Sequence, residues 1–452
     1  MPPVPWTRWF GRPKTSSFAI WKKEPRSAGR GISMTEESKP SKILLSAYAC
    51  EPGRGSEPAV GWNWAVHLAR LGHEVWVVTR SNNREAIELF LSSSEDLPWK
   101  KSLHFLYTDL PPWLKRWKKG SRGIHCYYFL WQWTAFRSAR KVHRVERFDA
   151  VHHVTFASIH QPSFMGLLGI PFLFGPVGGG EAAPYRLRRG YPLQGWLRDF
   201  LRDLLNLSGR FDPWMHLTFA TASKIFVTSE QSRRCIHRFY QGKTRVRLAI
   251  GIEKFEPPKP LPFEPSEFKI LFVGQLLYLK GLHFLLEAFA LAKKAQPSLR
   301  LTIAGNGPQE NWCRRRAEEL GLGPSIEWHD WMPREDLLKL YAEHHLFLFP
   351  SLHDSGGFVV LEALANGIPV VCLDIGGPGL IVDPTCGRVV VTKEKNEREV
   401  SQSLSLALLE SMEPLRYEKL RCGALRRAEE FQWARRIEEF CLSGHYPEAK
   451  HE

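Results

Sequence analysis

Short runs of apolar residues alternate along this chain with segments in which apolar positions recur at helical spacing. Near the start, residues 43–48 predict a buried strand, residues 62–69 a helix, and residues 75–79 the next strand. Strand, helix and strand in this order make a βαβ unit, whose right-handed crossover places both strands parallel in one sheet. Further strands are predicted at 150–154, 171–174 and 224–228.

The same pattern begins again in the second half of the chain. Residues 269–273 predict a strand, and residues 282–292 predict a helix after a glycine-bearing loop. Later strands are predicted at 299–304, 346–349 and 369–373. The whole pattern predicts an α/β protein with two doubly wound, Rossmann-like parallel sheets. A ligand site is expected in the cleft between them, at the carboxyl ends of the strands.

Changes in composition and the positions of proline- and glycine-rich segments divide the chain into five parts. They are a basic N-terminal segment expected to be disordered (1–40), a first Rossmann-like domain (41–255), a proline-rich linker (256–266), a second Rossmann-like domain (267–430), and a last helix with a tail (431–452). The first part lacks the apolar core of a secretory signal. Two explanations of it stay open: translation that begins at Met34, or a basic tail that touches a membrane.

Charge and cysteine content narrow the class of protein. The net charge is +15, with 31 basic against 17 acidic residues over 35–250, and 24 against 29 over 251–452. A basic front half suits phosphates, anionic lipid or nucleic acid, but no nucleic-acid-binding motif is present, so nucleic acid is not expected as a partner. The eight scattered cysteines form no metal-ligand or disulfide pattern, which favours the cytoplasm. No apolar run is long enough to span a bilayer.

The run at 350–371 carries the strongest chemical signal. It predicts a strand, a polar loop, a short helix and a second strand. Gly356 and Gly357 expose backbone N–H groups at the start of the helix, where a phosphate can bind without a Cβ in the way. Asp354 and Glu362 flank that place and can accept hydrogen bonds from sugar hydroxyls. The alternative is that Asp354 only caps the helix and Glu362 is a solvated helix residue.

This run resembles the D/E-x7-E signature of the family-four retaining glycosyltransferases, which have the GT-B fold and bind a nucleotide sugar in the second domain. The resemblance implies that Asp354 contacts the transferred sugar, that the amides of Phe358 and Val359 meet the distal phosphate, and that Glu362 holds the ribose. Gly357 matches the glycine of the signature. The sequence departs from it by having Asp for the usual Glu and Gly356 for the usual Phe.

Two further motifs of the second half resemble the same family. Residues 274–281 are similar to G-R-L-x-x-x-K-G, in which the basic residues clamp the donor diphosphate; Lys280 is present, but Gln275 replaces the arginine. Residues 304–308 resemble the A-G-x-G-P turn beside the nucleotide, which implies a donor contact for Asn306. The F-x-W at 431–433 implies a last helix that packs back on the first domain.

The first half offers weaker candidates, each with a purely structural alternative. Gly55 lies in the first glycine-rich loop, where the family contacts donor phosphate. Glu181 follows a second glycine-rich loop, similar to that of bacterial polysaccharide-assembly members, and is assigned to an acceptor hydroxyl. His152 and His153 end a strand that matches the family's D-x-x-H. Because strand residues alternate, only one histidine faces the cleft, and we assign His152 to it as a catalytic residue, with Lys280 and Asp354.

The resemblance implies a retaining hexosyltransferase that moves sugar from a nucleotide diphosphate to a glycan acceptor. No D-x-D motif follows a predicted strand, so neither a metal nor a cofactor is expected. Aromatic and basic residues mix at 111–119, 127–136 and 186–210. These segments suggest a lipid-linked acceptor and a peripheral position on the cytoplasmic face of an anionic membrane; packing within the domain is the alternative. Two other functions stay open: an inactive sugar-nucleotide-binding relative, and transfer to a small soluble acceptor.

Overall fold

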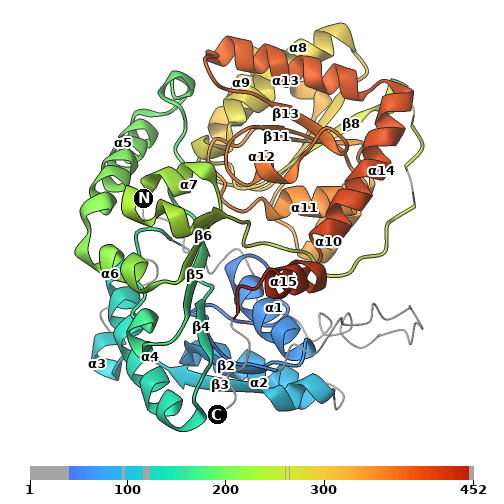
Figure 1. The fold of residues 1–452 in the computed structure, drawn as a ribbon. Helices are drawn as coiled ribbons and strands as arrows, with labels where there is room; N and C mark the ends of the chain where they lie inside the picture. Colours follow the sequence, from blue (N-terminus) through green and yellow to red (C-terminus); the bar gives the residue numbers. More distant parts are fainter. Residues whose placement is uncertain are drawn as a thin grey trace.

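The computed structural model describes residues 40–93, 97–115, 123–156, 158–259, 261–263 and 265–446. Two parallel sheets, each with helices on both faces, form the molecule (Figure 1). This arrangement confirms the predicted fold class. The predicted basic segment, apart from Pro40, and the tail after Tyr446 lie outside the described residues.

The first sheet has seven parallel strands in the order β3-β2-β1-β4-β5-β6-β7. Separate apolar cores fill its two faces, one under α1 and the other under α4 and α6. The strands are β1 Lys42–Ser46, β2 Glu74–Arg80, β3 Leu103–Thr108, β4 Ala150–His153, β5 Phe172–Val177, β6 Lys224–Val227 and β7 Thr244–Val246. The helices are α1 Glu57–Arg70, α2 Arg84–Ser93, α3 Pro112–Lys115, α4 Ile124–Glu146, α5 Leu193–Ser208, α6 Pro213–Thr221 and α7 Glu230–Cys235.

The second sheet has six parallel strands in the order β10-β9-β8-β11-β12-β13. Its strands are β8 Lys269–Val273, β9 Arg300–Ala304, β10 Ile326–His329, β11 Leu346–Phe349, β12 Val370–Leu373 and β13 Gly387–Val390. Its helices are α8 Leu282–Ala295, α9 Glu310–Glu319, α10 Arg334–Ala342, α11 Phe358–Ala365, α12 Pro378–Ile381, α13 Glu397–Ser411 and α14 Pro414–Glu430. α15, Trp433–Leu442, follows.

The chain passes between the two domains more than once. After the linker it returns at residues 431–433. There the amide of Ile252 donates to the carbonyl oxygen of Phe431, and the amide of Trp433 donates to the carbonyl oxygen of Ile252. α15 then packs against α1, and its side chains Trp433 and Phe440 join the core of the first domain (Figure 1). In the other direction, the loop after β5 reaches across, and Leu187 and Tyr191 are buried in the core of the second domain.

The aromatic helices α4 and α5 differ sharply in burial. In α4, the side chains of Tyr127, Tyr128, Trp131 and Phe136 are buried in the first domain, whereas Leu130 and Trp133 are exposed. Most aromatic side chains of 127–136 therefore pack within the domain. These rings pack on the sheet because their helical spacing places them on one face. In α5, only Gly195 and Asp199 are buried, and the apolar side chains point outward.

Candidate functional site

The loops that follow β8 and β11 meet at the carboxyl edge of the second sheet. β8 is the point at which the strand order reverses, since β9 lies on one side of it and β11 on the other. Such a switch point leaves a crevice between the loops, which is where α/β sheets bind ligands. Gly281 has a φ of 67°, and a Cβ there would lie 1.9 Å from the carbonyl oxygen of Pro350. Only glycine lets the two loops approach this closely.

An ion pair joins these two loops. Nζ of Lys280 lies 2.7 Å from Oδ2 of Asp354, while Oδ1 accepts hydrogen bonds from the amides of Gly356 at 3.1 Å and Gly357 at 2.8 Å. Burial raises the pKa of Asp354, but the charge and hydrogen bond of Lys280 and the two amides outweigh it, so the pKa lies below its ordinary value. The carboxylate is therefore ionised and fixed at neutral pH.

The start of α11 offers free backbone donors next to this ion pair. Gly357 precedes the helix in the left-handed conformation, with a φ of 87°. Within the described part of the chain, the amides of Phe358 and Val359 donate to no acceptor, as expected for the first turn of a helix. An anion held there gains both the donors and the positive end of the helix dipole.

Glu362 lies one turn further along α11. Its Oε1 is 3.4 Å from Nε of Arg334, at the start of α10. Burial raises the pKa of Glu362 above its ordinary value, although the Arg334 charge opposes that shift. Sequence reasoning missed Arg334, because it lies outside every motif.

The two neutral donor-side candidates lie on adjacent loops of the same edge. The amide of Leu276, next to Gln275, donates to the backbone oxygen of Asn306 at 2.9 Å, so the loops after β8 and β9 are joined. Both side chains are half-buried. The structure thus brings Gln275 and Asn306 to the same edge as Lys280 and Asp354.

The loop after β5 brings the first domain to this edge. A Cβ on Gly178 would lie 2.8 Å from Cβ of Ser355, next to Asp354. Glu181 is fully buried, and its carboxylate accepts hydrogen bonds from the hydroxyls of Thr228 at 3.1 Å, Ser229 at 2.6 Å and Ser232 at 2.9 Å. The assignment of Glu181 to an acceptor hydroxyl is therefore corrected: these bonds occupy the carboxylate, which holds the loop in place.

The predicted role of His152 also requires correction. Its ring is fully buried between Trp64 and Phe440 and does not face the cleft. Nε2 donates to the carbonyl oxygen of Gly175 at 2.7 Å, and Nδ1 accepts from the hydroxyl of Tyr446 at 2.6 Å. Burial lowers the pKa of His152 to about 3, so the ring is neutral. His152 connects β4 to the C-terminal segment, a contact that no local sequence pattern reveals.

The remaining first-domain candidates are at the carboxyl end of the first sheet. Gly55 is half-buried in the loop between β1 and α1, next to the place where the strand order reverses between β1 and β4. His153 lies on the opposite face from His152, and its Nε2 is 3.2 Å from the hydroxyl of Tyr128. The predicted alternation of the two histidines is therefore confirmed, but both rings are buried.

Sequence reasoning missed a basic residue that the first domain brings to the site. Arg202, on the inner face of α5, donates to Oδ1 of the buried Asp199 at 2.9 Å, and its Nη1 lies 3.5 Å from Nδ1 of His353. Burial, and next the charge of Arg202, lower the pKa of His353 to about 4. The signal was available: Gly195, Asp199 and Arg202 recur at helical spacing on the one face of α5 that is not apolar.

Clustered metal ligands, disulfides and membrane-spanning helices are absent from the described part of the chain. Within residues 40–446, as far as the structure describes them, no three His, Cys, Asp or Glu side chains lie together in a way that could hold a metal ion. The eight cysteines, all of them described, form no disulfide. Among the described helices, none combines the length and the apolar composition that a bilayer span requires.

Comparison with known proteins shows a similarity to one family in the second domain. Residues 253–420 match the family model of glycosyl transferases group 1. A D-inositol 3-phosphate glycosyltransferase from Segniliparus rotundus is 34% identical over 151 residues, which are 32% of this chain and 33% of the relative. The chain thus spans about a third of the length of this curated relative.

Solved structures resemble the chain over most of its length. Sucrose-phosphate synthase from Thermosynechococcus elongatus has a TM-score of 0.58 at 18% identity, over 89% of this chain and 98% of that one. WaaG, a glycosyltransferase involved in lipopolysaccharide biosynthesis, has a TM-score of 0.52 at 17% identity, over 88% and 98%. At these identities the similarity shows the fold alone, and it extends over both domains.

Proposed function

We propose that this chain transfers a hexose-type sugar from a nucleotide diphosphate to a glycan acceptor, with retention of the anomeric configuration, because residues 253–420 match the family model of glycosyl transferases group 1. One observation carries the proposal. Lys280, the ion-paired Asp354, the free amides of Phe358 and Val359, and Glu362 gather at the switch point of the second sheet.

Each group has a distinct task in this proposal. The ammonium of Lys280 and the amides at the start of α11 bind the diphosphate, and Glu362 accepts hydrogen bonds from the ribose. Asp354, fixed by the amides of the loop, orients the sugar. These groups are all held in place before the donor arrives, which lowers the cost of reorganisation in the transition state.

The reaction that follows needs no nucleophile from the protein. The bond between C1 of the sugar and the phosphate oxygen breaks, and the acceptor oxygen bonds to C1 on the same face. The departing phosphate oxygen takes the proton of the acceptor hydroxyl. Lys280 and the α11 amides stabilise the charge that develops on that phosphate, so a bound metal is not required in this mechanism. Gln275 stands where the family has an arginine and supplies no positive charge. Arg202, from the first domain, contributes a positive charge from the other side of the cleft.

A donor panel tests the proposed function. We expect one of the UDP-, GDP- or ADP-linked hexoses to raise the melting temperature of the purified protein, because a ligand that binds only the folded state stabilises it by mass action. Incubation of that donor with glycan acceptors is expected to give a product with unchanged anomeric configuration by NMR. Binding without transfer to any glycan or small soluble acceptor would instead indicate an inactive relative, and no stabilisation by any donor would contradict the proposal.

We further propose that α5 rests on the surface of an anionic membrane, and that the acceptor is lipid-linked. Along residues 193–214, ten large apolar side chains are each at least 41% exposed, among them Leu193 at 84%. An apolar patch of this kind on a globular protein marks a place of interaction. Its rim is basic, with the exposed arginines Arg186, Arg189, Arg198 and Arg210, which suits lipid phosphates.

Sedimentation with vesicles tests the membrane surface. Wild-type protein is expected to sediment with phosphatidylglycerol vesicles at low salt and to be released at high salt. The double substitution Phe200→Ser and Leu204→Ser is expected to weaken binding at least about tenfold, because each large apolar side chain contributes about 1.5–3 kcal/mol when buried. Leu406→Ser on α13 serves as the control, since Leu406 belongs to the second domain and is more exposed than Phe200 or Leu204. Equal loss in the control, or no binding by the wild type at low salt, would refute the proposal.

A further inference from the structure

A basic hollow lies beside the two segments that connect the domains. Its volume is about 410 Å³, and its walls come from the chain crossing at residues 246–248, from α12, and from the last two helices. The charged side chains that line it are Arg247, Arg427, Glu430, Arg435, Arg436 and Glu439. We call this hollow, with these six residues, the hinge pocket, because it touches both segments that connect the two domains.

The four arginines of the hinge pocket are not equally neutralised. Arg427 forms an ion pair with Glu430 at 2.6 Å, and Arg435 forms one with Glu439 at 3.0 Å. Arg436 instead donates to the carbonyl oxygen of Leu248 at 3.1 Å, and Arg247 donates to the hydroxyl of Ser443 at 3.3 Å. Within the part of the chain that the structure describes, neither of these two forms an ion pair with a carboxylate.

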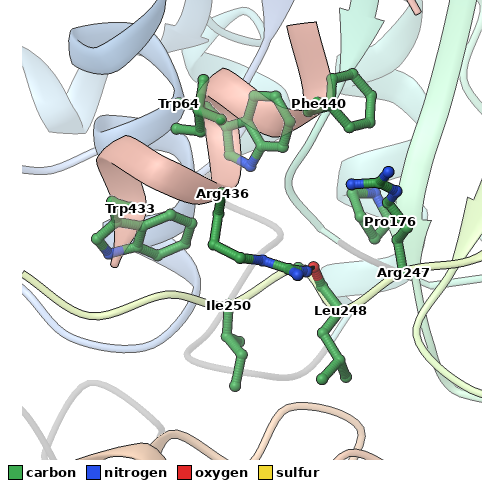
Figure 2. A pocket seen from close by; sticks show the side chains of 10 residues that line it. Trp64, Pro176, Arg247, Leu248, Ile250, Trp433, Arg436 and Phe440 are labelled. Atoms are coloured by element: carbon green, nitrogen blue, oxygen red, sulfur yellow. Dashed lines mark hydrogen bonds between the residues drawn. The ribbon is translucent and has the colours of Figure 1, made fainter. Parts of the chain in front are cut away.

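Arg247 and Arg436 are both half-buried. A smaller cavity of about 10 Å³ adjoins the hinge pocket, and Arg247 and Arg436 both line it together with Trp433 and Phe440 (Figure 2). Burial, and next the charge of Arg247, lower the pKa of Arg436. Like charges held near one another with little water are unfavourable unless an opposite charge joins them.

Aromatic rings fix the orientation of these cations. The guanidinium carbon of Arg436 lies 5.0 Å from the ring centre of Phe431, that of Arg427 lies 5.1 Å from the same ring, and that of Arg247 lies 5.8 Å from Phe440. A planar guanidinium that is already oriented loses less freedom when it binds a phosphate through two parallel N–H donors. The hinge pocket is thus both positively charged and preorganised.

We propose that the hinge pocket is a binding site for a phosphate-bearing anion, separate from the donor cleft, with Arg247 and Arg436 as its main ligands. The volume accommodates a phosphate with an organic group attached. Because the walls include residues 246–248 and the start of α15, a bound anion joins the two chain crossings and restrains the movement of one domain against the other. The proposal does not depend on the function proposed above.

Calorimetric titration with inorganic pyrophosphate tests the site. Wild-type protein is expected to bind pyrophosphate, and Arg247→Gln and Arg436→Met are each expected to weaken this binding about tenfold or more. Arg421→Gln is the matched control, since Arg421 lies on α14 and pairs with Glu418 outside the pocket; it is expected to bind as the wild type does. Hydrogen exchange is expected to show protection at residues 246–248 and 431–439 when pyrophosphate is bound.

A Lys280→Ala variant distinguishes pyrophosphate binding in the donor cleft from binding in the hinge pocket. This variant is expected to retain the pyrophosphate binding that depends on Arg247, whether or not the chain transfers sugar. Binding that Lys280→Ala abolishes and Arg247→Gln leaves unchanged would overturn the proposal, as would absence of binding to the wild type. Should Arg436→Met fail to fold, Arg247→Gln decides, because among the described residues the side chain of Arg247 donates only one hydrogen bond, to the hydroxyl of Ser443.

The source of the anion is distinguished by a second titration. Short-chain phosphatidic acid and glycerol 3-phosphate carry the same phosphate ester, but only the first carries lipid chains. Tighter binding of the first indicates a lipid headgroup, and equal binding indicates a soluble phosphate ester. In either case, Arg247→Gln is expected to weaken binding, and an unchanged affinity in that variant would refute the site.

Discussion

Replacing Lys280 with alanine is expected to lower kcat/KM for sugar transfer by about 100- to 1,000-fold, the range for removal of one preorganised electrostatic partner of the transition state. The ammonium is fixed 2.7 Å from Asp354 and shares the loop edge with the start of α11. Negative charge on the leaving diphosphate grows as the C1–oxygen bond breaks, so the ammonium stabilises the transition state more than the bound donor. Steady-state kinetics with the donor identified in the panel measures the loss, and a fall mainly in kcat is expected.

Stability measurements separate this catalytic loss from structural damage. The pKa of Asp354 is lowered in the folded state, so its ion pair stabilises the protein above the unfolded-state pKa, and this stabilisation disappears as the pH falls through the folded-state pKa. Lys280→Ala should therefore melt below the wild type at pH 7, and the difference should shrink in acid. Lys280→Arg keeps the charge and should retain part of the activity. Wild-type kcat/KM in Lys280→Ala would refute the proposed donor site.

Replacing Glu362 with alanine is expected to lower kcat/KM by at least about 100-fold, with most of the effect in the KM of the donor. A carboxylate that accepts two ribose hydroxyls contributes about 1.5–3 kcal/mol per hydrogen bond. Because the pKa of Glu362 is raised, the ionised acceptor is lost early in acid, so donor affinity in the wild type should fall as the pH drops through that raised pKa. Donor KM measured across pH in both proteins tests this: the decline should be absent from Glu362→Ala.

A donor that lacks the ribose hydroxyls provides the control for Glu362. With a 2′,3′-dideoxyribose donor, Glu362→Ala should cost little beyond what the wild type already loses, since both changes remove the same interaction. Arg334→Gln removes the ion pair of the free protein without removing the ribose acceptor, and it should retain transfer. If Glu362→Ala discriminates against the dideoxy donor as strongly as the wild type does, Glu362 does not bind the ribose.

The strands show where sequence patterns succeed and where they do not. The central strands of both sheets, such as β1, β8 and β11, were predicted because burial on both faces requires continuous apolar runs. The four strands without a prediction, β3, β7, β10 and β13, are the edges of the two sheets. In β3, only Leu103 is buried. Edge strands are partly exposed, so their sequences carry no such run.

The candidate site likewise has residues that the sequence predicted and residues that it misassigned. The sequence predicted two parts of the site, the run from Asp354 to Glu362 and the loop that ends at Lys280. In both, the functional groups lie in a short stretch of sequence whose glycines and strand ends fix the backbone locally. Glu181 and His152 were misassigned, because a buried carboxylate and an exposed one have the same sequence. The partners that decide between them, Ser229 and Tyr446, lie 48 and 294 residues away.

The sequence by itself therefore determined two doubly wound domains and the phosphate-binding edge of the second, because these features follow from local hydrophobic period and turn chemistry. Only the tertiary structure decided which charged groups meet: Lys280 with Asp354, Arg202 beside His353, and Arg436 within reach of the charge of Arg247. Such meetings depend on how distant segments pack and how much water their packing excludes. The electrostatic energy of a charged group depends on this packing and on the exclusion of water. Neither can be predicted from the residues adjacent to that group in the sequence.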